Sequence, residues 1–202
     1  MQKISIAIGV MPPTWREPML APHVQASPEL VDFPALVSRK LDGIRCLIFP
    51  GEPAITRSGG MFPNEALPRR LALIRRIADR SGMVFDGELY EHGRGFYALQ
   101  SAIMSYGGDL AGIGFHAFDC LSYTEFEGES ITPYTTRIEK ACHLVGPGRT
   151  LKQHKVNTWA CAAALFRRFI TAGYEGAMIR RPEGLYRHGR CRISERELFR
   201  LK

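Results

Sequence analysis

The chain has 202 residues, enough for one sizeable hydrophobic core, so one domain is the simplest expectation. Hydrophobic residues make up 45% and charged residues 23%, which excludes a low-complexity or disordered chain. Lys and Arg total 27 against 20 Asp and Glu, a formal net charge of +7. This excess favours a polyanionic partner, because Lys and Arg displace counterions from phosphate backbones.

The five cysteines are odd in number, widely spaced and never in a C-x-x-C pair. That pattern argues against a disulfide framework and against a zinc knuckle, and it suits a reducing compartment. The short apolar run at residues 4–10 has no small-residue cleavage site after it, so we interpret it as a strand or an ordered arm. No apolar run approaches membrane-spanning length, and we expect a cytoplasmic protein that does not bind membranes.

The first predicted elements are strands at 35–38 and 44–49, on either side of a tight Lys-Leu-Asp-Gly turn. We expect Gly43 to supply the backbone freedom that this turn needs. A short strand follows at 54–57. Residues 64–80 read as an amphipathic helix with Asn64 as its cap, because apolar residues recur on one face.

Further along, the pattern predicts a strand at 83–91, a short helix at 96–105 and a strand at 112–121. Thr132 and Pro133 begin another helix, with Thr132 as the cap. Asn157 or Thr158 caps a helix that runs to Gly173, and strands at 176–181 and 198–202 follow. No strand–helix–strand rhythm repeats, so the predicted fold class is α+β with mainly antiparallel sheets.

The segment Lys40-Leu41-Asp42-Gly43-Ile44-Arg45 carries the clearest chemistry. Its four fixed positions, K-x-D-G-x-R, occur by chance in a chain of this length only on the order of a few times in a thousand. A lysine that attacks phosphorus must be neutral, and nearby cations such as Arg45, Arg57 and Lys202 favour the neutral form. A turn between two strands also holds the lysine rigidly, which suits an in-line attack.

These six residues resemble motif I of the covalent nucleotidyltransferases, which comprise DNA ligases, RNA ligases and mRNA capping enzymes. Four later segments resemble motifs III, IIIa, IV and V of this superfamily, in order: Phe85-Asp86-Gly87-Glu88-Leu89, Phe115-His116-Ala117-Phe118-Asp119, Glu175-Gly176-Ala177-Met178-Ile179-Arg180 and Phe199-Arg200-Leu201-Lys202. Residues 17–21, 56–58, 101–105 and 186–190 are similar to small phage-type DNA ligases. The resemblance covers residues 17–202, and five ordered motifs are far more specific than one.

The resemblance implies a nucleotidyltransferase (adenylation) domain, ATP-grasp-like, over residues 1–202, without the C-terminal oligonucleotide-binding domain that follows in DNA ligases. It implies an ATP-dependent DNA ligase that seals nicks in duplex DNA as a monomer, through a covalent lysyl-AMP. ATP and Mg²⁺ (or Mn²⁺) would be its cofactors. DNA repair, replication and recombination are the processes that such an enzyme serves.

The resemblance also implies roles for single residues. Lys40 would form the lysyl-adenylate, and Arg45 would contact the nucleotide sugar and help to place the phosphates. Glu88 would bind the ribose hydroxyls. Phe118 would stack on adenine, although on an alternating strand it could instead be a core residue.

Metal binding would fall to Glu175, with Asp86 supporting catalysis or the metal, since hard oxygen ligands suit Mg²⁺. Arg57 would meet the 5′-phosphate of the nick. Lys202 would bridge to the transferred phosphate. Arg200 stands where ligases usually carry the first lysine of motif V, and its planar guanidinium is not equivalent to a point ammonium.

Two alternatives stay open. One is an RNA ligase or a capping guanylyltransferase, against which the Asp-Gly-Glu-Leu of motif III and the phage-ligase-like flanks speak. The other is a non-catalytic module that binds nicks or duplex. Arg200 and the missing oligonucleotide-binding domain favour it, and the intact Lys40, Glu88 and Glu175 oppose it.

Overall fold

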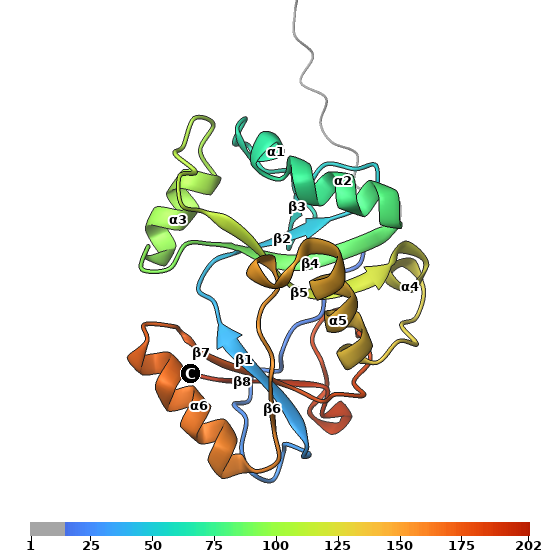
Figure 1. Cartoon of the computed structure of the whole chain (residues 1–202), viewed down its shortest axis with the longest axis vertical. Coiled ribbons are helices and arrows are strands. Elements are labelled where there is room, and N and C mark those ends of the chain that lie inside the picture. The colour runs from blue at the N-terminus through green and yellow to red at the C-terminus, as the bar shows by residue number, and fades with distance from the viewer. Residues whose placement is uncertain (1–14) are drawn as a thin grey trace, which may run out of the picture.

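The computed structural model describes residues 15–202, and its centre is a pair of four-stranded antiparallel sheets (Figure 1). The first sheet contains, in spatial order, β3 (Ile55–Thr56), β2 (Ile44–Ile48), β4 (Met83–Tyr90) and β5 (Gly114–Ser122). The second contains β6 (His154–Val156), β1 (Ala35–Lys40), β7 (Gly176–Arg180) and β8 (Leu198–Leu201). The predicted α+β class with antiparallel sheets is confirmed.

Helices pack on both sheets. They are α1 (Leu67–Arg70), α2 (Ala72–Ser81), α3 (Phe96–Ile103), α4 (Tyr123–Glu127), α5 (Tyr134–Val145) and α6 (Trp159–Thr171), with short 3-10 turns η1 (Pro147–Arg149) and η2 (Ile193–Glu195). In Figure 1, α1, α2, α3 and α5 lie around the first sheet and α6 lies along the second. No helix among residues 15–202 is long and apolar enough to cross a membrane.

Three hydrophobic cores hold these layers together. One joins the first sheet to α1, α2, α3 and α5, one joins the second sheet to α6, and the third lies between the sheets. Strand β2 shows why: Cys46 and Ile48 point into the first core, and Leu47 points into the third. Because both faces are covered here, Cys46, Leu47 and Ile48 form an apolar run that does not alternate with polar residues.

The helix predicted at 64–80 is in fact two helices that begin later, and Asn64 is not its cap. The buried Asn64 amide donates to the carbonyls of Ala102 and Gly108, at 2.9 Å each, and its oxygen accepts from the amide of Ala66. A polar side chain that the sequence pattern assigns to a cap thus joins its own loop to α3 and to the loop that follows α3. Gly82, in the left-handed conformation at φ 66°, ends α2.

The predicted cap at Thr132 is also wrong, because Pro133 holds the cap position of α5 and no side chain bonds to the first turn. The cap of α6 is confirmed: the Thr158 hydroxyl accepts from the amide of Cys161 at 3.3 Å. Strand β6 and helix α4 were not predicted. The strand expected at residues 4–10 lies outside the described residues.

Two segments far apart in sequence run side by side. Residues 20–26 form parallel bridges with residues 190–200, at Leu20↔Arg190 and Gln25↔Arg200. The amide of Leu20 donates to the carbonyl of Gly189 and the amide of Ala26 to that of Arg200, each at 2.8 Å. Residues 20–26 therefore lie alongside β8 and the loop that precedes it.

Candidate active site

Three neighbouring strands bring together charged residues from distant parts of the sequence. Lys40, the last residue of β1, lies opposite Gly176 on β7, and Ala177 on β7 lies opposite Leu201 on β8. Glu175 precedes β7 and Lys202 follows β8, so both reach the end of β1 that carries Lys40. The two oxygens of Glu175 accept from the ammonium groups of Lys40 and Lys202, one each.

The electrostatics of Glu175 follow from this contact. Burial alone raises the pKa of its carboxyl group, but hydrogen bonds and charge from Lys202 and Lys40 outweigh burial, and the pKa is lowered. The side chain of Glu175 is 17% exposed and that of Lys40 is 20% exposed, so both remain open to a ligand. The group is an ionised carboxylate between two ammonium ions.

A second charged group lies on the paired strands β2 and β4. Nε of Arg45 donates to Oδ1 of Asp86 at 2.7 Å and Nη2 donates to Oδ2 at 2.5 Å, a bidentate contact. The third Arg45 nitrogen, Nη1, donates to the Met19 carbonyl at 2.9 Å. Burial lowers the pKa of Arg45, but the attraction of Asp86 outweighs it, so the pKa is raised and Arg45 stays charged.

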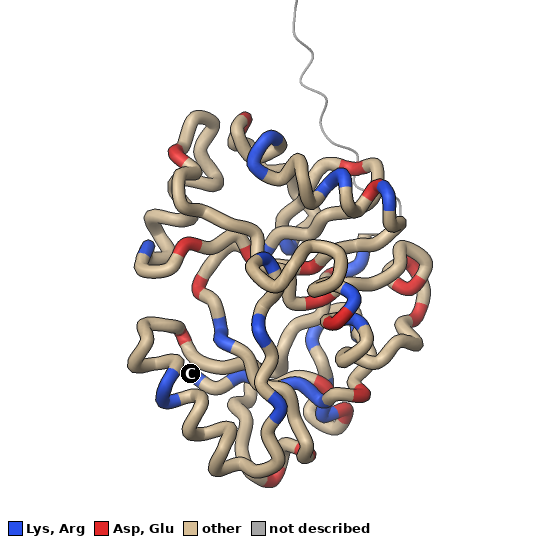
Figure 2. Tube along the Cα trace, viewed as in Figure 1, with Lys and Arg blue, Asp and Glu red and all other residues tan. Residues whose placement is uncertain are grey.

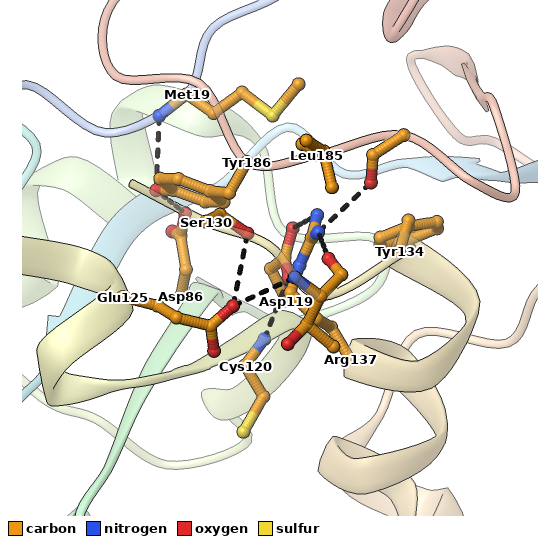
Figure 3. A network of polar contacts seen from close by, with 12 residues as sticks. Met19, Asp86, Asp119, Cys120, Glu125, Ser130, Tyr134, Arg137, Leu185 and Tyr186 are labelled. Carbon is orange, nitrogen blue, oxygen red and sulfur yellow. Dashed lines mark hydrogen bonds and ion pairs between the residues drawn. The ribbon is translucent and has the colours of Figure 1, made fainter. Parts of the chain in front are cut away.

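Asp86 is not placed to hold a metal ion, contrary to the expectation from sequence. Its side chain is fully buried, and Oδ2 also accepts from the hydroxyl of Tyr186 at 2.7 Å. Figure 3 shows Asp86 beneath the ring of Tyr186. Both oxygens are occupied by donors that orient Arg45, which leaves none directed at a ligand.

Glu88 lies opposite Arg45 in the pairing of β2 with β4. Burial raises the pKa of its carboxyl group to about 7, although Arg45 and Lys40 oppose the shift. A Cβ on Gly43 would lie 2.4 Å from the Leu89 carbonyl oxygen and 2.7 Å from Cγ of Glu88. Gly43 is therefore needed because the chain passes close to β4 at this point. Its φ does not lie in the left-handed region, so the expectation that glycine supplies backbone freedom for the turn is wrong.

A cavity of about 600 Å³ lies beside these groups and is lined by Lys40, Arg45, Glu88 and Phe118. Phe118 belongs to none of the three cores among residues 15–202, so it is not a core residue. The guanidinium carbon of Arg45 lies 4.8 Å from the centre of its ring. A flat aromatic surface beside a cationic group suits a nucleobase joined to phosphates.

Most of the charged side chains that line the cavity are cationic. In the described chain, six arginines and Lys40 line it, against one carboxylate, Glu88; the arginines are Arg39, Arg45, Arg57, Arg180, Arg190 and Arg200. Figure 2 shows Lys and Arg positions along the strands where the two sheets approach each other. Such a surface attracts phosphate groups.

A buried ion network joins the two sheets next to the cavity. Asp119 on β5 accepts from Nε of Arg137 at 2.7 Å and from Nη1 of Arg180, on β7, at 2.9 Å. Figure 3 shows Arg137 and Tyr134 beside Asp119. Burial raises the pKa of Asp119, but Arg137 and Arg180 outweigh it and lower the pKa. The hydroxyl of Tyr134 donates to the Phe118 carbonyl at 3.1 Å, which fixes the aromatic residue of the cavity.

Solved structures share the fold that carries this site. A structure of Chlorella virus DNA ligase-adenylate superposes with a TM-score of 0.74 and 26% identity, over 93% of this chain and 67% of the viral one. Another structure of that ligase-adenylate gives 0.72 and 25%, over 92% and 68%. The chain has the fold of the ATP-dependent DNA ligases. The ligase of bacteriophage T7 in complex with ATP shares the fold at 14% identity and a TM-score of 0.70, over 92% of this chain and 68% of its own. Neither protein-family models nor curated proteins match the chain.

The predicted site residues occupy different parts of the ligase fold. Lys40, Glu175 and Lys202 form one group, and Arg45, Glu88 and Phe118 form a second group on the cavity wall. Arg57 is exposed in the turn after β3 and lines the cavity mouth. Arg200 lines the cavity while Nη2 donates to the His23 carbonyl at 3.0 Å.

Several cavity residues of this ligase fold had no role assigned from sequence. Met19 contributes the carbonyl that holds Arg45, and Arg39 lies next to Lys40 on β1. Tyr134 reaches Phe118 from α5. Met19, Arg180 and Arg190 carried a usable signal, because all three fall inside segments that resemble DNA ligases. The sequence does not show, however, that Met19 acts through its main-chain carbonyl.

The described residues offer few protein ligands for a divalent metal in this site. Among residues 15–202 no cluster of three or more His, Cys, Asp or Glu side chains could hold an ion. Mg²⁺ commonly uses one or two carboxylates and takes its other oxygens from water and substrate phosphates. Of the two carboxylates that the sequence suggests as metal ligands, Glu175 is partly exposed to the site, whereas the Asp86 side chain is fully buried.

Proposed function

We propose that residues 1–202 form one nucleotidyltransferase domain of an ATP-dependent DNA ligase, which seals nicks in duplex DNA through AMP carried on Lys40. The observation that carries the proposal is the contact of Lys40 with Glu175 and of Glu175 with Lys202 at the edge of a cationic cavity. A reactive amine, a carboxylate and a second ammonium at one point are the groups that phosphoryl transfer needs.

In the first step Nζ of Lys40, having lost a proton, attacks the α-phosphorus of ATP. A P–N bond forms, and the bond to pyrophosphate breaks. The adenine lies against Phe118, Glu88 accepts hydrogen bonds from the ribose hydroxyls, and Arg45 places the sugar and phosphates. Lys202 compensates charge on the transferred phosphate.

In the second step an oxygen of the 5′-phosphate at the nick attacks the same phosphorus, and the P–N bond breaks. In the third step the 3′-hydroxyl attacks the 5′-phosphorus and AMP leaves. Arg57 binds the 5′-phosphate, and Arg200 adds a further cation to the wall. Mg²⁺, or Mn²⁺ in its place, bound through Glu175, would supply charge compensation on the phosphate oxygens.

The same proposal includes nicked duplex DNA as the partner, a monomer as the working form and the cytoplasm as the location. The relatives support the choice of DNA, since the similar structures are named DNA ligases. An enzyme that seals nicks would act in DNA repair, replication or recombination.

The test is incubation with α-labelled ATP and Mg²⁺, followed by denaturing electrophoresis. We expect a protein-bound label that is acid-labile and alkali-stable, as a phosphoramidate is, and that is absent in Lys40→Ala. The matched control is Lys155→Ala, at an exposed lysine on β6, which should label as the wild type does.

Three outcomes separate the alternatives. Labelling by GTP instead of ATP indicates a capping enzyme, and sealing of nicked RNA but not nicked DNA indicates an RNA ligase. No label on the wild-type protein, with retained binding to nicked duplex, indicates a non-catalytic binding module.

A further inference from the structure

A closed ring of hydrogen bonds surrounds the side chain of Arg45. Arg45 donates to both oxygens of Asp86 and to the Met19 carbonyl. The hydroxyl of Tyr186 donates to Oδ2 of Asp86 at 2.7 Å and accepts from the amide of Met19 at 3.1 Å. Figure 3 shows this hydroxyl directed at Met19 on one side and Asp86 on the other. The ring joins four segments of the chain that are far apart in sequence.

We propose that Tyr186 is a positioning residue for the nucleotide: through Asp86 it fixes Arg45 over the ring of Phe118, where the base and sugar bind. This inference rests on the proposed function, since it assigns Tyr186 to the handling of ATP. Tyr186 does not line the cavity, so it acts through the ring of bonds and not by contact with the nucleotide.

Because this ring of hydrogen bonds is buried, loss of the Tyr186 hydroxyl carries a large free-energy penalty. Tyr186 is 3% exposed and the Asp86 side chain is fully buried, so water cannot replace the missing partner. Without the hydroxyl, the amide of Met19 loses its acceptor and Asp86 loses one of its donors. Buried groups left without partners rearrange or carry a large penalty. Arg45, which shares both Met19 and Asp86, then has more than one accessible orientation.

A purely packing role would give a different result. The ring of Tyr186 lies 6.0 Å from that of Phe126 and 5.5 Å from that of His188, and phenylalanine keeps these contacts. If only the aromatic ring of Tyr186 mattered, Tyr186→Phe would handle ATP as the wild type does. If the hydroxyl positions Arg45, the nucleotide-dependent step must change while the rest of the site is untouched.

The experiment measures Lys40 adenylation at a series of ATP concentrations. Tyr186→Phe should raise the KM for ATP by roughly three- to tenfold and change the maximal rate by less than about twofold, since weaker ground-state placement of the nucleotide appears in KM. The matched control is Tyr106→Phe, because Tyr106 also donates to a carboxylate, Glu65, but is exposed and outside the cavity. It should leave both values at the wild-type level.

A double-mutant cycle separates positioning from general weakening of the fold. In an Arg45→Lys background, which already lacks the bidentate contact, Tyr186→Phe should add less than about a twofold further rise in KM. Equal effects of Tyr186→Phe in both backgrounds would overturn the inference.

Circular dichroism identifies a temperature at which Tyr186→Phe is folded. A folded variant with wild-type KM overturns the inference, and so does a variant that is unfolded at every temperature, because its hydroxyl then serves stability alone. A wild-type protein and a Tyr106→Phe control that take no label refute the proposed function instead, so the two failures are distinguishable.

Discussion

The ammonium of Lys40 contacts the carboxylate of Glu175 although the two residues lie 135 positions apart in sequence. The pairing of β1 with β7, which sets Lys40 opposite Gly176, produces this contact. Glu175→Gln keeps the shape but removes the charge that holds both Lys40 and Lys202. We expect a loss of adenylation of about 100-fold or more, a magnitude typical for removal of one electrostatic group from a site.

Single-turnover labelling with ATP checks this loss. Glu183→Gln is the control, because its side chain is 69% exposed and lies outside the cavity. Labelling of Glu175→Gln at the wild-type rate across Mg²⁺ concentrations would refute its role.

The raised pKa of Glu88 predicts a pH-dependent stability. Burial lifts this pKa from 4.5 to about 7, so between these values the folded state holds a proton that the unfolded state has released. The free energy of unfolding must therefore fall as pH rises through this window, by up to about 3 kcal/mol. Glu88→Gln, which is always neutral, should lose this part of the pH dependence. Urea unfolding of both proteins at about pH 5 and pH 8 measures the difference, and parallel curves would count against the assignment.

Gly43→Ala should lower both the stability of the protein and its affinity for ATP. The new Cβ would meet the Leu89 carbonyl oxygen at 2.4 Å and Cγ of Glu88 at 2.7 Å, so β2 or Glu88 must move. We expect a loss of about 1–3 kcal/mol in the free energy of unfolding, together with weaker ATP binding. Gly148→Ala serves as the control, since nothing lies within 4 Å of a Cβ there. Wild-type stability and ATP binding in Gly43→Ala would show that the strands yield without cost.

Arg57 should contribute one phosphate contact to DNA binding. It is exposed, lines the cavity and forms no ion pair with the described part of the chain. Arg57→Ala should weaken binding to nicked duplex and reduce the slope of log K against log salt by about 0.9. Arg80→Ala, on the exposed side of α2 outside the cavity, should leave the slope unchanged. The same reduction in both variants would mean that Arg57 acts only through net charge.

The sequence motifs predicted which charged residues lie together, but not the contacts that hold these residues in place. The order of the motifs singles out Lys40, Glu175 and Lys202, and β1, β7 and β8 bring all three together. The role of Asp86 could not be predicted in this way. A carboxylate next to Glu88 suggests a metal ligand until its full burial and its bond to Tyr186 are known.

Local propensity failed where tertiary contacts decide the use of a polar side chain. Asn64 and Thr132 both look like helix caps. The Asn64 amide instead bonds to two distant carbonyls, and Pro133 instead of Thr132 holds the cap position of α5. The sequence predicted a need for glycine at position 43, but attributed it to the turn. The need comes from close packing against β4, a strand whose Leu89 pairs with Ile44 from 45 residues further along the chain, and no local pattern shows this contact.

The parallel bridges Leu20↔Arg190 and Gln25↔Arg200 have a consequence for synthesis on the ribosome. Contacts of such long sequence separation form late, since the intervening chain must be made and ordered first. A nascent chain that ends before β8 carries Lys40, but it has neither Lys202 nor the cavity wall that these bridges build. We expect such an unfinished copy to leave ATP untouched, so that adenylation is confined to chains whose synthesis has passed this last strand.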